Sequence, residues 1–226
     1  MPLIDTRLIH WMNYKYDATG YLHWGWNYWN ENPYKDTGRH VGDGWHVYPV
    51  EDGILNSIRW EQMRNGIQDY EYFMMLENRI RALKDSLGTR FSWIDPKFMG
   101  KEIIREVIHD FYERSSDPAV LYSARKKILD QLLDFERFPQ LYIQTDPVTN
   151  SVVTEHSSVA VYGWVEPGTN IVMNGKEIEV SPDGLFLQQL GGDYIDDRKI
   201  PLGDRIIIQA LSDKGEKEVI REFIIK

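Results

Sequence analysis

The chain has 226 residues, enough for two modest domains, and its 42% hydrophobic and 27% charged residues are ordinary for a globular protein. A formal net charge of −9, with no stripe of Lys and Arg, argues against a nucleic-acid partner. The chain contains no Cys, which excludes disulfides and thiolate metal sites, and no apolar run reaches the roughly 18 residues of a membrane span.

The first part of the chain is rich in aromatic residues. Residues 5–16 begin with Asp5 as an N-cap and continue with apolar residues at helical spacing, which predicts a helix that Gly20 ends. Residues 19–29 have a near period-2 aromatic pattern and predict a strand. Residues 30–53 are rich in Gly, Pro, Asn and Asp and predict a long loop, which in a compact domain is more often functional than accidental.

Three helices are predicted after this loop. Apolar residues recur at helical spacing over residues 57–87, and Gly88 closes this long helix. Residues 101–114 and 117–137 predict two further amphipathic helices, and Asp117 is the expected N-cap of the second.

From residue 138 onward, short apolar alternations separated by turn signals predict β-strands. One of the turns, Asn174-Gly175, is of a kind that favours a type I′ hairpin. About seven strands in so short a stretch indicate an immunoglobulin-like β-sandwich. We therefore place one domain at residues 1–137 and a second at 138–226. The expected strands are 141–145, 159–164, 170–173, 177–180, 185–190, 205–211 and 218–225.

The single strand of the first domain has no neighbour with which to pair, and a buried backbone does not tolerate unmatched N–H and C=O groups. A helix, a strand, a long loop and a long helix, in that order, are typical of the closing portion of an α/β repeat. We predict an α/β domain followed by an all-β one. The first is the C-terminal part of a (β/α)8 barrel, comprising its last strand, the long helix and two further helices. The missing strands are expected upstream in the same parent or in a partner chain.

Three segments carry a resemblance to a known family. They are GYLHWGWNYWNENPY at residues 20–34, GDGWHVYP at 42–49 and SIRWEQMRNGIQDYEYFMMLE at 57–77. Together they resemble the C-terminal portion of the glycoside hydrolase family 123 catalytic domain, and equally the related domain-of-unknown-function family 4091. The family commonly has Asp where this chain has Asn65. The matching positions are Gly20, Leu22, Trp24, Gly25, Asn27, Trp29, Gly42, Asp43, Gly44, Arg59, Glu61, Arg64, Gly66, Asp69, Tyr70 and Glu71.

The resemblance implies a barrel whose eighth strand is residues 20–29, with the end that carries Asn27 opening at the catalytic face. It also implies hydrolysis of β-linked N-acetylgalactosamine, in which the 2-acetamido group attacks the anomeric carbon, assisted by an adjacent Asp-Glu pair. The adjacent acidic pairs here, Glu51-Asp52 and Asp196-Asp197, do not end a barrel strand. We therefore expect no catalytic residue in this chain, an acidic pair upstream of it, and no activity of the chain alone.

The predicted strand supplies the first candidates for sugar binding. Trp24, Asn27 and Trp29 are the expected substrate contacts, because aromatic rings stack on the C–H faces of a pyranose and an amide binds a hydroxyl or amide group. Trp24 and Trp26 share a face of the strand and Asn27 lies on the other. Packing between barrel and helices is the alternative role of Trp24 and Trp26.

The loop and the long helix supply the remaining candidates. Trp45 and Tyr48 either face the ligand or anchor the loop, and Arg59 lies close enough to the helix start to reach the site. Glu31, Asp43 and His46 are interpreted as solvated loop residues. Glu61 and Arg64 are i,i+3 neighbours, and with Arg59, Asp69 and Glu71 they are interpreted as an ion-pair lattice that holds the helix in place. The His residues lack metal-ligand spacing, so no metal and no cofactor are expected.

A non-catalytic carbohydrate-binding or scaffolding module is the alternative function. A complete enzyme is not expected, because an eight-stranded barrel needs about 200 residues or more. The C-terminal part is similar to small sandwich modules of bacterial exported hydrolases. We therefore expect a bacterial parent that is periplasmic, at the cell surface or secreted, and leave the location of this chain open. The sequence does not determine the sugar, its linkage, the oligomeric state or whether the sandwich binds glycan.

Overall fold

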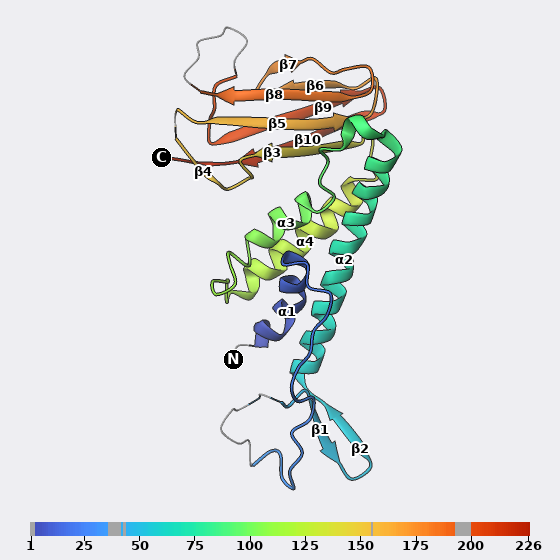
Figure 1. The fold of residues 1–226 in the computed structure, drawn as a ribbon, viewed down its shortest axis with the longest axis vertical. Coiled ribbons are helices and arrows are strands. Elements are labelled where there is room, and N and C mark those ends of the chain that lie inside the picture. The colour runs from blue at the N-terminus through green and yellow to red at the C-terminus, as the bar shows by residue number, and fades with distance from the viewer. Residues whose placement is uncertain (1–2, 36–41, 43, 155, 193–199) are drawn as a thin grey trace. The chain divides into compact units, whose positions relative to one another are not determined.

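A computed structural model describes residues 3–35, 42, 44–154, 156–192 and 200–226. The chain divides into two compact units, Met1–Asp130 and Gln131–Lys226. The first unit is mainly helical and the second is built of strands, as Figure 1 shows. The expected combination of helices and sheets is therefore confirmed. The domain boundary at residue 138, the barrel and the immunoglobulin-like topology stay predictions.

One long helix organises the first unit. It begins after Ser57, whose side-chain oxygen accepts a hydrogen bond of 3.2 Å from the backbone N–H of Trp60, so the hydroxyl caps the helix. The predicted helix at residues 57–87 and its end at Gly88 are confirmed. The elements in chain order are α1 (Leu3–Lys15), β1 (Val47–Val50), β2 (Gly53–Asn56), α2 (Ile58–Leu87), η1 (Thr89–Phe91), α3 (Phe98–Arg105) and α4 (Pro118–Asp134).

Helix α1 lies along α2 and packs on it through aromatic rings (Figure 1). Phe73 of α2 stacks on Tyr14 with ring centroids 4.8 Å apart, and Trp11 meets Phe73 edge-on at 5.0 Å. The two helices approach most closely at Gly66, where a methyl group would overlap the backbone carbonyl of Arg7. The absence of a side chain at Gly66 therefore permits the contact that the rings need.

A buried carboxylate joins α1, α2 and α4. Asp69 is fully buried and accepts hydrogen bonds from Arg7 at 2.7 and 3.0 Å, from the Trp11 indole at 3.0 Å and from Arg125 at 2.8 Å. Charge-assisted bonds of this kind offset the cost of taking the charges out of water. For Asp69, the predicted ion-pair role in holding the long helix is confirmed.

The helix predicted at residues 101–114 is shorter than expected. Helix α3 ends at Arg105, and the chain then turns back through an isolated bridge between Ile108 and Arg114. The Asp110 carboxylate accepts hydrogen bonds from two backbone N–H groups that follow it, at 2.6 and 2.7 Å. These local bonds satisfy the backbone in a turn and so compete with a continued helix. The helix predicted at 117–137 is present as α4, with Asp117 as its cap.

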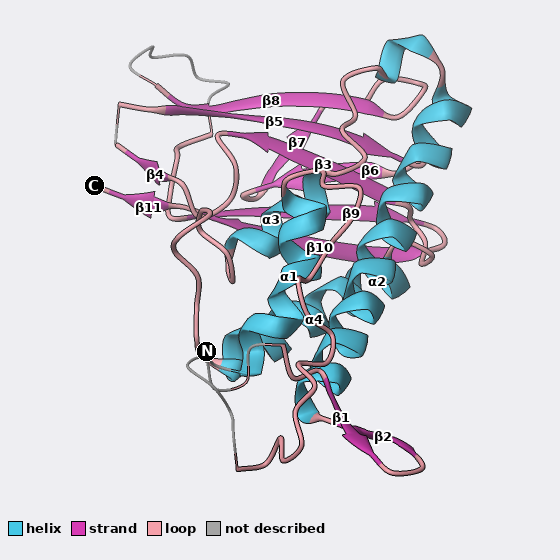
Figure 2. Ribbon diagram, turned by 60° about the horizontal axis from the view of Figure 1, so that its bottom comes forward, coloured by secondary structure: helices cyan, strands magenta, loops and turns pink. Residues whose placement is uncertain are grey.

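The strand predicted at residues 19–29 was wrong for the described part of the chain, where this segment takes part in only one bridge, between Asn27 and Trp45. A strand forms only where a neighbour can pair along its length, and no described strand lies beside this segment. The loop predicted at 30–53 was partly wrong, because β1 and β2 form a hairpin from residue 47 onward. Figure 2 shows this hairpin at the N-terminal end of α2.

The second unit consists of two antiparallel sheets around one core. One sheet has the strand order β10-β9-β6-β7 and the other β3-β5-β8, while β11 pairs in parallel with β4. Each of the seven predicted strand segments contains a strand, and β4 was not predicted. The strands are β3 (Leu141–Asp146), β4 (Val152–Val153), β5 (Ser158–Val165), β6 (Asn170–Met173), β7 (Lys176–Ile178), β8 (Leu185–Gly191), β9 (Arg205–Ser212), β10 (Gly215–Glu222) and β11 (Ile224–Ile225).

Alternate residues of these strands point inward, as the period-2 pattern predicts. Val159 and Val161 of β5 and Ile206 and Ile208 of β9 all belong to the shared core and are almost fully buried. The predicted hairpin turn Asn174-Gly175 is confirmed, since both residues have positive φ and join β6 to β7. No helix in the described part of either unit is long and apolar enough to span a membrane.

Candidate functional site

The segment of residues 20–29 meets the loop before β1 at a single point. Asn27 and Trp45 pair across the antiparallel bridge, and one backbone hydrogen bond on each side, of 2.8 and 3.1 Å between N and O, closes it. Directly opposed residues of such a bridge lie on the same face. The bridge therefore brings two predicted site residues, 18 positions apart in the sequence, onto one face.

A chain of touching rings surrounds this bridge, and we call it the aromatic cluster: Trp24, Tyr28, Tyr34, Trp45 and Tyr48. Trp24 meets Tyr28 at 6.0 Å between ring centroids, and Tyr28 meets Trp45 at 5.9 Å. Trp45 stacks on Tyr48 at 5.7 Å, and Tyr48 stacks on Tyr34 at 4.9 Å. The cluster thus joins Trp45 and Tyr48 of the predicted loop to Trp24 of the 20–29 segment, all three of which are predicted site residues.

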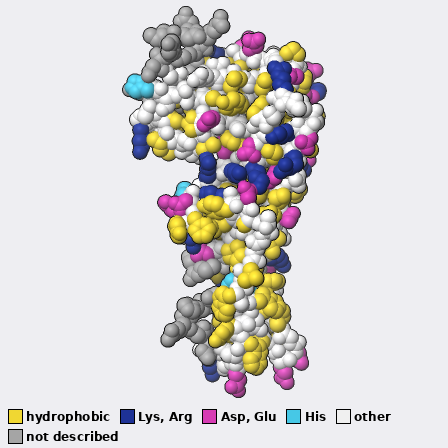
Figure 3. Space-filling model, viewed as in Figure 1, with side chains coloured by type: hydrophobic (Ala, Val, Ile, Leu, Met, Phe, Trp, Pro, Cys, Tyr) yellow, Lys and Arg dark blue, Asp and Glu magenta, His cyan; other side chains and the backbone are white. Residues whose placement is uncertain are grey.

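The cluster has one buried member and an exposed surface. Trp45 is 2% exposed, whereas Trp24 and Tyr34 are each 61% exposed. Hydrophobic side chains gather on the surface at this end of the first unit in Figure 3, near the hairpin. A contiguous exposed apolar surface of this kind is typical of an interaction or ligand site.

Arg59, in the first turn of α2, is bonded to the cluster. Its guanidinium donates to the Trp45 carbonyl oxygen and to the Tyr48 hydroxyl, both at 3.4 Å. Gly42 leaves room for it: its φ is 89°, and a side chain there would overlap the guanidinium. Ser57 fixes the same helix end, because its hydroxyl donates a bond of 2.6 Å to the His46 carbonyl. The structure thus brings Arg59, Trp45 and Tyr48 together.

Asn27 is positioned by the bridge, and its side-chain oxygen is buried without a hydrogen-bond partner among the described residues. Such an orphaned acceptor is uncommon in a folded protein and needs an explanation. Trp29 is 73% exposed and makes none of the described ring contacts. Trp26 meets Trp60 edge-on at 5.8 Å and is 46% exposed. Trp24 and Trp26 are both exposed in the described part of the chain, and their alternative role in packing between barrel and helices stays a prediction.

Sequence reasoning missed two rings of the cluster, Tyr28 and Tyr34. No pattern could have found them, because their neighbours depend on how the loop folds back on the bridge. The interpretation of His46 as a solvated residue was wrong, since it is 6% exposed and its ring lies 4.5 Å from that of His23. Glu31 is exposed as expected, and Asp43 lies outside the described residues.

The acidic residues of this region bear on the expected catalytic pair only where the structure describes them. Glu51 and Asp52 are exposed at the turn between β1 and β2, and the pair Asp196-Asp197 lies outside the described residues. Glu61 pairs with Arg64 at 2.5 Å, as their spacing predicts. Within the described ranges, no three His, Asp or Glu side chains are placed to hold a metal ion.

Residues 1–76 match the family described as glycoside hydrolase 123, catalytic domain. The resemblance that the sequence motifs carry is therefore confirmed for this third of the chain, which contains every member of the aromatic cluster as well as Asn27, Trp29 and Arg59. No curated protein matches the sequence closely enough to count as a relative.

Three solved structures are similar over about half of the chain. An FMN-binding beta-glucuronidase from Facaelibacterium prausnitzii L2-6 shares 12% identity over 52% of this chain and 15% of its own, with a TM-score of 0.26. An endo-beta-1,4-mannanase from Thermotoga petrophila has 11% sequence identity over 52% of this chain and 27% of its own length, with a TM-score of 0.27. A putative beta-galactosidase from Bacteroides fragilis has 15% sequence identity over 45% of this chain and 15% of its own length, with a TM-score of 0.24. The matched part of this chain spans less than a third of each of these proteins.

Proposed function

We propose that this chain is the C-terminal part of a glycoside hydrolase-like protein that acts on glycans, with the aromatic cluster as one wall of the sugar site. One observation carries the proposal. The residues that the bridge between Asn27 and Trp45 brings together in the cluster all lie within residues 1–76, the part of the chain that matches the family. A set of sequence motifs and a spatial arrangement thus coincide.

The wall has the chemistry that a sugar requires. Exposed faces of Trp24 and Tyr34 stack on the C–H face of a pyranose, which removes apolar surface of both from water. The buried Asn27 oxygen is an acceptor that a hydroxyl or amide N–H of the sugar satisfies, which accounts for its lack of a partner in the described residues. The Arg59 guanidinium, held beside Tyr48, supplies donors for hydroxyl oxygens.

The finer parts of the proposal concern the parent protein. In the complete parent, residues 20–29 gain the pairing neighbours that they lack in the described part of this chain and form its eighth barrel strand. The C-terminal unit is an immunoglobulin-like sandwich, and the substrate is a β-N-acetylgalactosaminide hydrolysed with the help of its own acetamido group. The position of residues 20–29 before the long helix α2, inside the stretch that matches the family, supports the strand assignment. The acidic pair is supplied by the barrel portion upstream.

Binding is tested with methyl β-N-acetylgalactosaminide, titrated into the purified chain and followed by nuclear magnetic resonance. Trp24→Ala and Trp29→Ala are expected to weaken binding about threefold to tenfold, the value of one aromatic contact. Tyr112→Ala is the control, because Tyr112 is also an exposed aromatic residue (89% exposed) and lies outside the cluster. Equal affinity of the Trp24 and Trp29 variants, the control and the wild type contradicts the wall assignment.

Turnover is tested with an aryl β-N-acetylgalactosaminide. The chain alone is expected to release no aryl alcohol, because it holds no acidic pair at the wall. If the chain hydrolyses the glycoside and Asn27→Ala abolishes that hydrolysis, the catalytic residues do not lie upstream and the proposal is contradicted. Glycan binding by a parent that never hydrolyses any glycoside would favour the alternative, a non-catalytic carbohydrate-binding module.

A further inference from the structure

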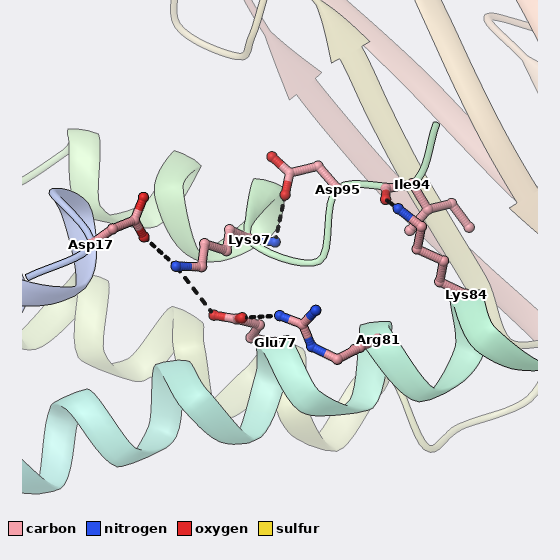
Figure 4. Close-up of polar contacts among 7 residues, drawn as sticks. All are labelled: Asp17, Glu77, Arg81, Lys84, Ile94, Asp95 and Lys97. Atoms are coloured by element: carbon pink, nitrogen blue, oxygen red, sulfur yellow. Dashed lines mark hydrogen bonds and ion pairs between the residues drawn. The ribbon is translucent and has the colours of Figure 1, made fainter. Parts of the chain in front are cut away.

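The helices of the first unit satisfy charged side chains within the chain. Lys97, just before α3, contacts Asp17 after α1 and lies 4.0 Å from Glu77 of α2, which also pairs with Arg81 (Figure 4). These ion pairs connect three helices to one another. The hairpin at the N-terminal end of α2 differs, because one of its edges has no partner among the described residues.

The open edge of the hairpin is that of β2. In the described part of the chain, β1 and β2 form a sheet of only two strands, and all four residues of β2 are exposed. The bridge between Asn27 and Trp45 brings the 20–29 segment beside the chain that leads into β1. A two-stranded hairpin by itself is marginally stable in water, and further strands stabilise it. A partner strand for β2 would therefore have a physical effect.

Pro49 determines which backbone groups of β2 point outward. Pro49 lies opposite Ile54, and Val50 lies opposite Gly53 across the turn. Because proline has no N–H, the positions of Pro49 and Ile54 form a non-hydrogen-bonded pair of the ladder, and such pairs alternate with hydrogen-bonded ones. The N–H and C=O groups of Ile54, and by the same alternation those of Asn56, therefore point away from β1.

The side chains of β2 leave this edge unprotected. Proteins usually protect an edge strand with charged side chains or proline. β1 has Pro49, whereas β2 (Gly53–Asn56) has neither a charge nor a proline. Two of its side chains are apolar and about half exposed, Ile54 at 51% and Leu55 at 48%. The edge thus combines outward backbone groups with an apolar, uncharged surface.

A second copy of the same strand fits this edge. Two β2 strands can pair antiparallel about a two-fold axis, with Ile54 of each copy opposite Asn56 of the other. All the outward N–H and C=O groups of these residues then form hydrogen bonds. Leu55 meets Leu55 of the second copy at the axis. Because Leu55 lies opposite Tyr48 within the hairpin, one apolar row crosses all four strands.

The same register brings opposite charges together. Glu51 lies three residues before Ile54, so it is level with Arg59 of the second copy, three residues after Asn56. Glu51 and the neighbouring residue of the turn are both acidic and exposed, whereas the start of a helix is its positive end. Elsewhere, a net charge of −9 makes two copies repel each other. The β2 edge is therefore a favourable place for them to meet.

We propose that β2 is a self-association edge, through which two copies of this chain form a continuous four-stranded antiparallel sheet. The contact is small for a protein interface, so the dimer is a weak one. It requires no glycan, and its test is therefore independent of the proposed function.

Sedimentation equilibrium of the whole chain, from micromolar to millimolar concentration, measures the association. We expect a monomer–dimer equilibrium that Leu55→Lys weakens about tenfold, because like charges then meet at the axis and the apolar row is broken. Leu22→Lys and Ile67→Lys change exposed apolar residues outside the hairpin (88% and 46% exposed) and should leave the equilibrium unchanged. A monomeric wild type overturns the proposal and leaves the barrel portion of the parent as the partner of β2. A dimer that Leu22→Lys abolishes and Leu55→Lys does not also overturns it.

The register is tested by a cross-link, which is specific because the chain contains no Cys. Leu55→Cys should form a disulfide-linked dimer in air, since the Cα atoms of a non-hydrogen-bonded antiparallel pair lie about 4.5 Å apart, within the span of a disulfide. Ile54→Cys is the matched control, at similar exposure. Its two copies are diagonal neighbours about 7–8 Å apart, too far for ready cross-linking. Cross-linking of Ile54→Cys as fast as that of Leu55→Cys, or none of Leu55→Cys, overturns the proposed pairing.

Discussion

The beginning and the middle of α2 differ in how their polar groups are satisfied. In the middle, Asp69 is fully buried and every bond that its carboxylate can accept comes from a nearby side chain. At the beginning, Arg59 bonds the Trp45 carbonyl and the hydroxyl of the half-buried Tyr48, and the Asn27 oxygen is left without a partner among the described residues. The middle of the helix thus secures the fold, and the beginning presents groups to something outside it. The predictions below test this division.

Asp69→Ala should have the largest effect. It leaves Arg7, 3% exposed, as a buried charge without its carboxylate, and loss of one partner of a buried pair costs about 3–5 kcal/mol. Urea unfolding measures the change. Glu61→Ala is the control from the beginning of the helix, where the Arg64 partner is 63% exposed and the expected loss is about 0–1 kcal/mol. Similar losses in both variants would remove the distinction between the two parts of α2.

Gly66→Ala should be destabilising although Ala is the better helix former. The gain in helix propensity is about 1 kcal/mol, but the added methyl overlaps the Arg7 carbonyl, and overpacking costs about 1–3 kcal/mol. We expect a net loss on the order of 1 kcal/mol in the free energy of unfolding. Gly20→Ala is the control, because nothing lies within 4 Å of the added atom. A more stable Gly66→Ala variant would show that the helices can move apart freely.

Ser57→Ala should cost about 1 kcal/mol as a lost N-cap. It also removes the bond of 2.6 Å to the His46 carbonyl, which ties the loop to the helix start. We therefore expect faster amide exchange at Trp45 and His46 than in the wild type, in addition to the loss of stability. Unchanged exchange in the loop would show that the bridge to Asn27 alone holds it.

The smallest expected effect is a pH dependence at His10 of α1. Burial lowers the pKa of His10 below its unfolded value, so between the two pKa values the unfolded chain binds more protons. His10 therefore makes stability rise with pH up to its unfolded pKa of about 6.5. In His10→Gln the fall in stability on acidification should be less steep than in the wild type. His109→Gln, at an exposed position, serves as the control, and an equal flattening there would exclude burial as the cause.

Capping and turn residues were sufficient to predict the helices and the hairpin whose ends they mark. Ser57 and Gly88 delimit α2, Asp117 begins α4, and Asn174-Gly175 turns the chain between β6 and β7, each through bonds or dihedral angles that a few neighbouring residues determine. Residues 19–29 show the opposite case. Their aromatic pattern suits a strand, but a strand needs a partner, and partner positions are not encoded in the pattern of one segment.

The candidate site likewise contains residues that the sequence predicts and residues that only the fold brings together. Trp45, Tyr48 and Arg59 could be chosen from the sequence because the family motifs contain or flank them. Tyr28 and Tyr34 joined them only through the fold of the loop, and the burial of His46 follows from the same fold.

The close approach at Gly66 also fixes the sliding register of α1 on α2. A shift by one turn, about 5.4 Å, would bring Gln62 or Tyr70 against the Arg7 carbonyl, where only a residue without a side chain fits. The two helices therefore have one permitted alignment rather than a ladder of similar ones. Because only four residues separate α1 from residues 20–29, that alignment also limits how far along α2 the Asn27 segment begins. Gly66 therefore helps to determine where along α2 the aromatic cluster forms.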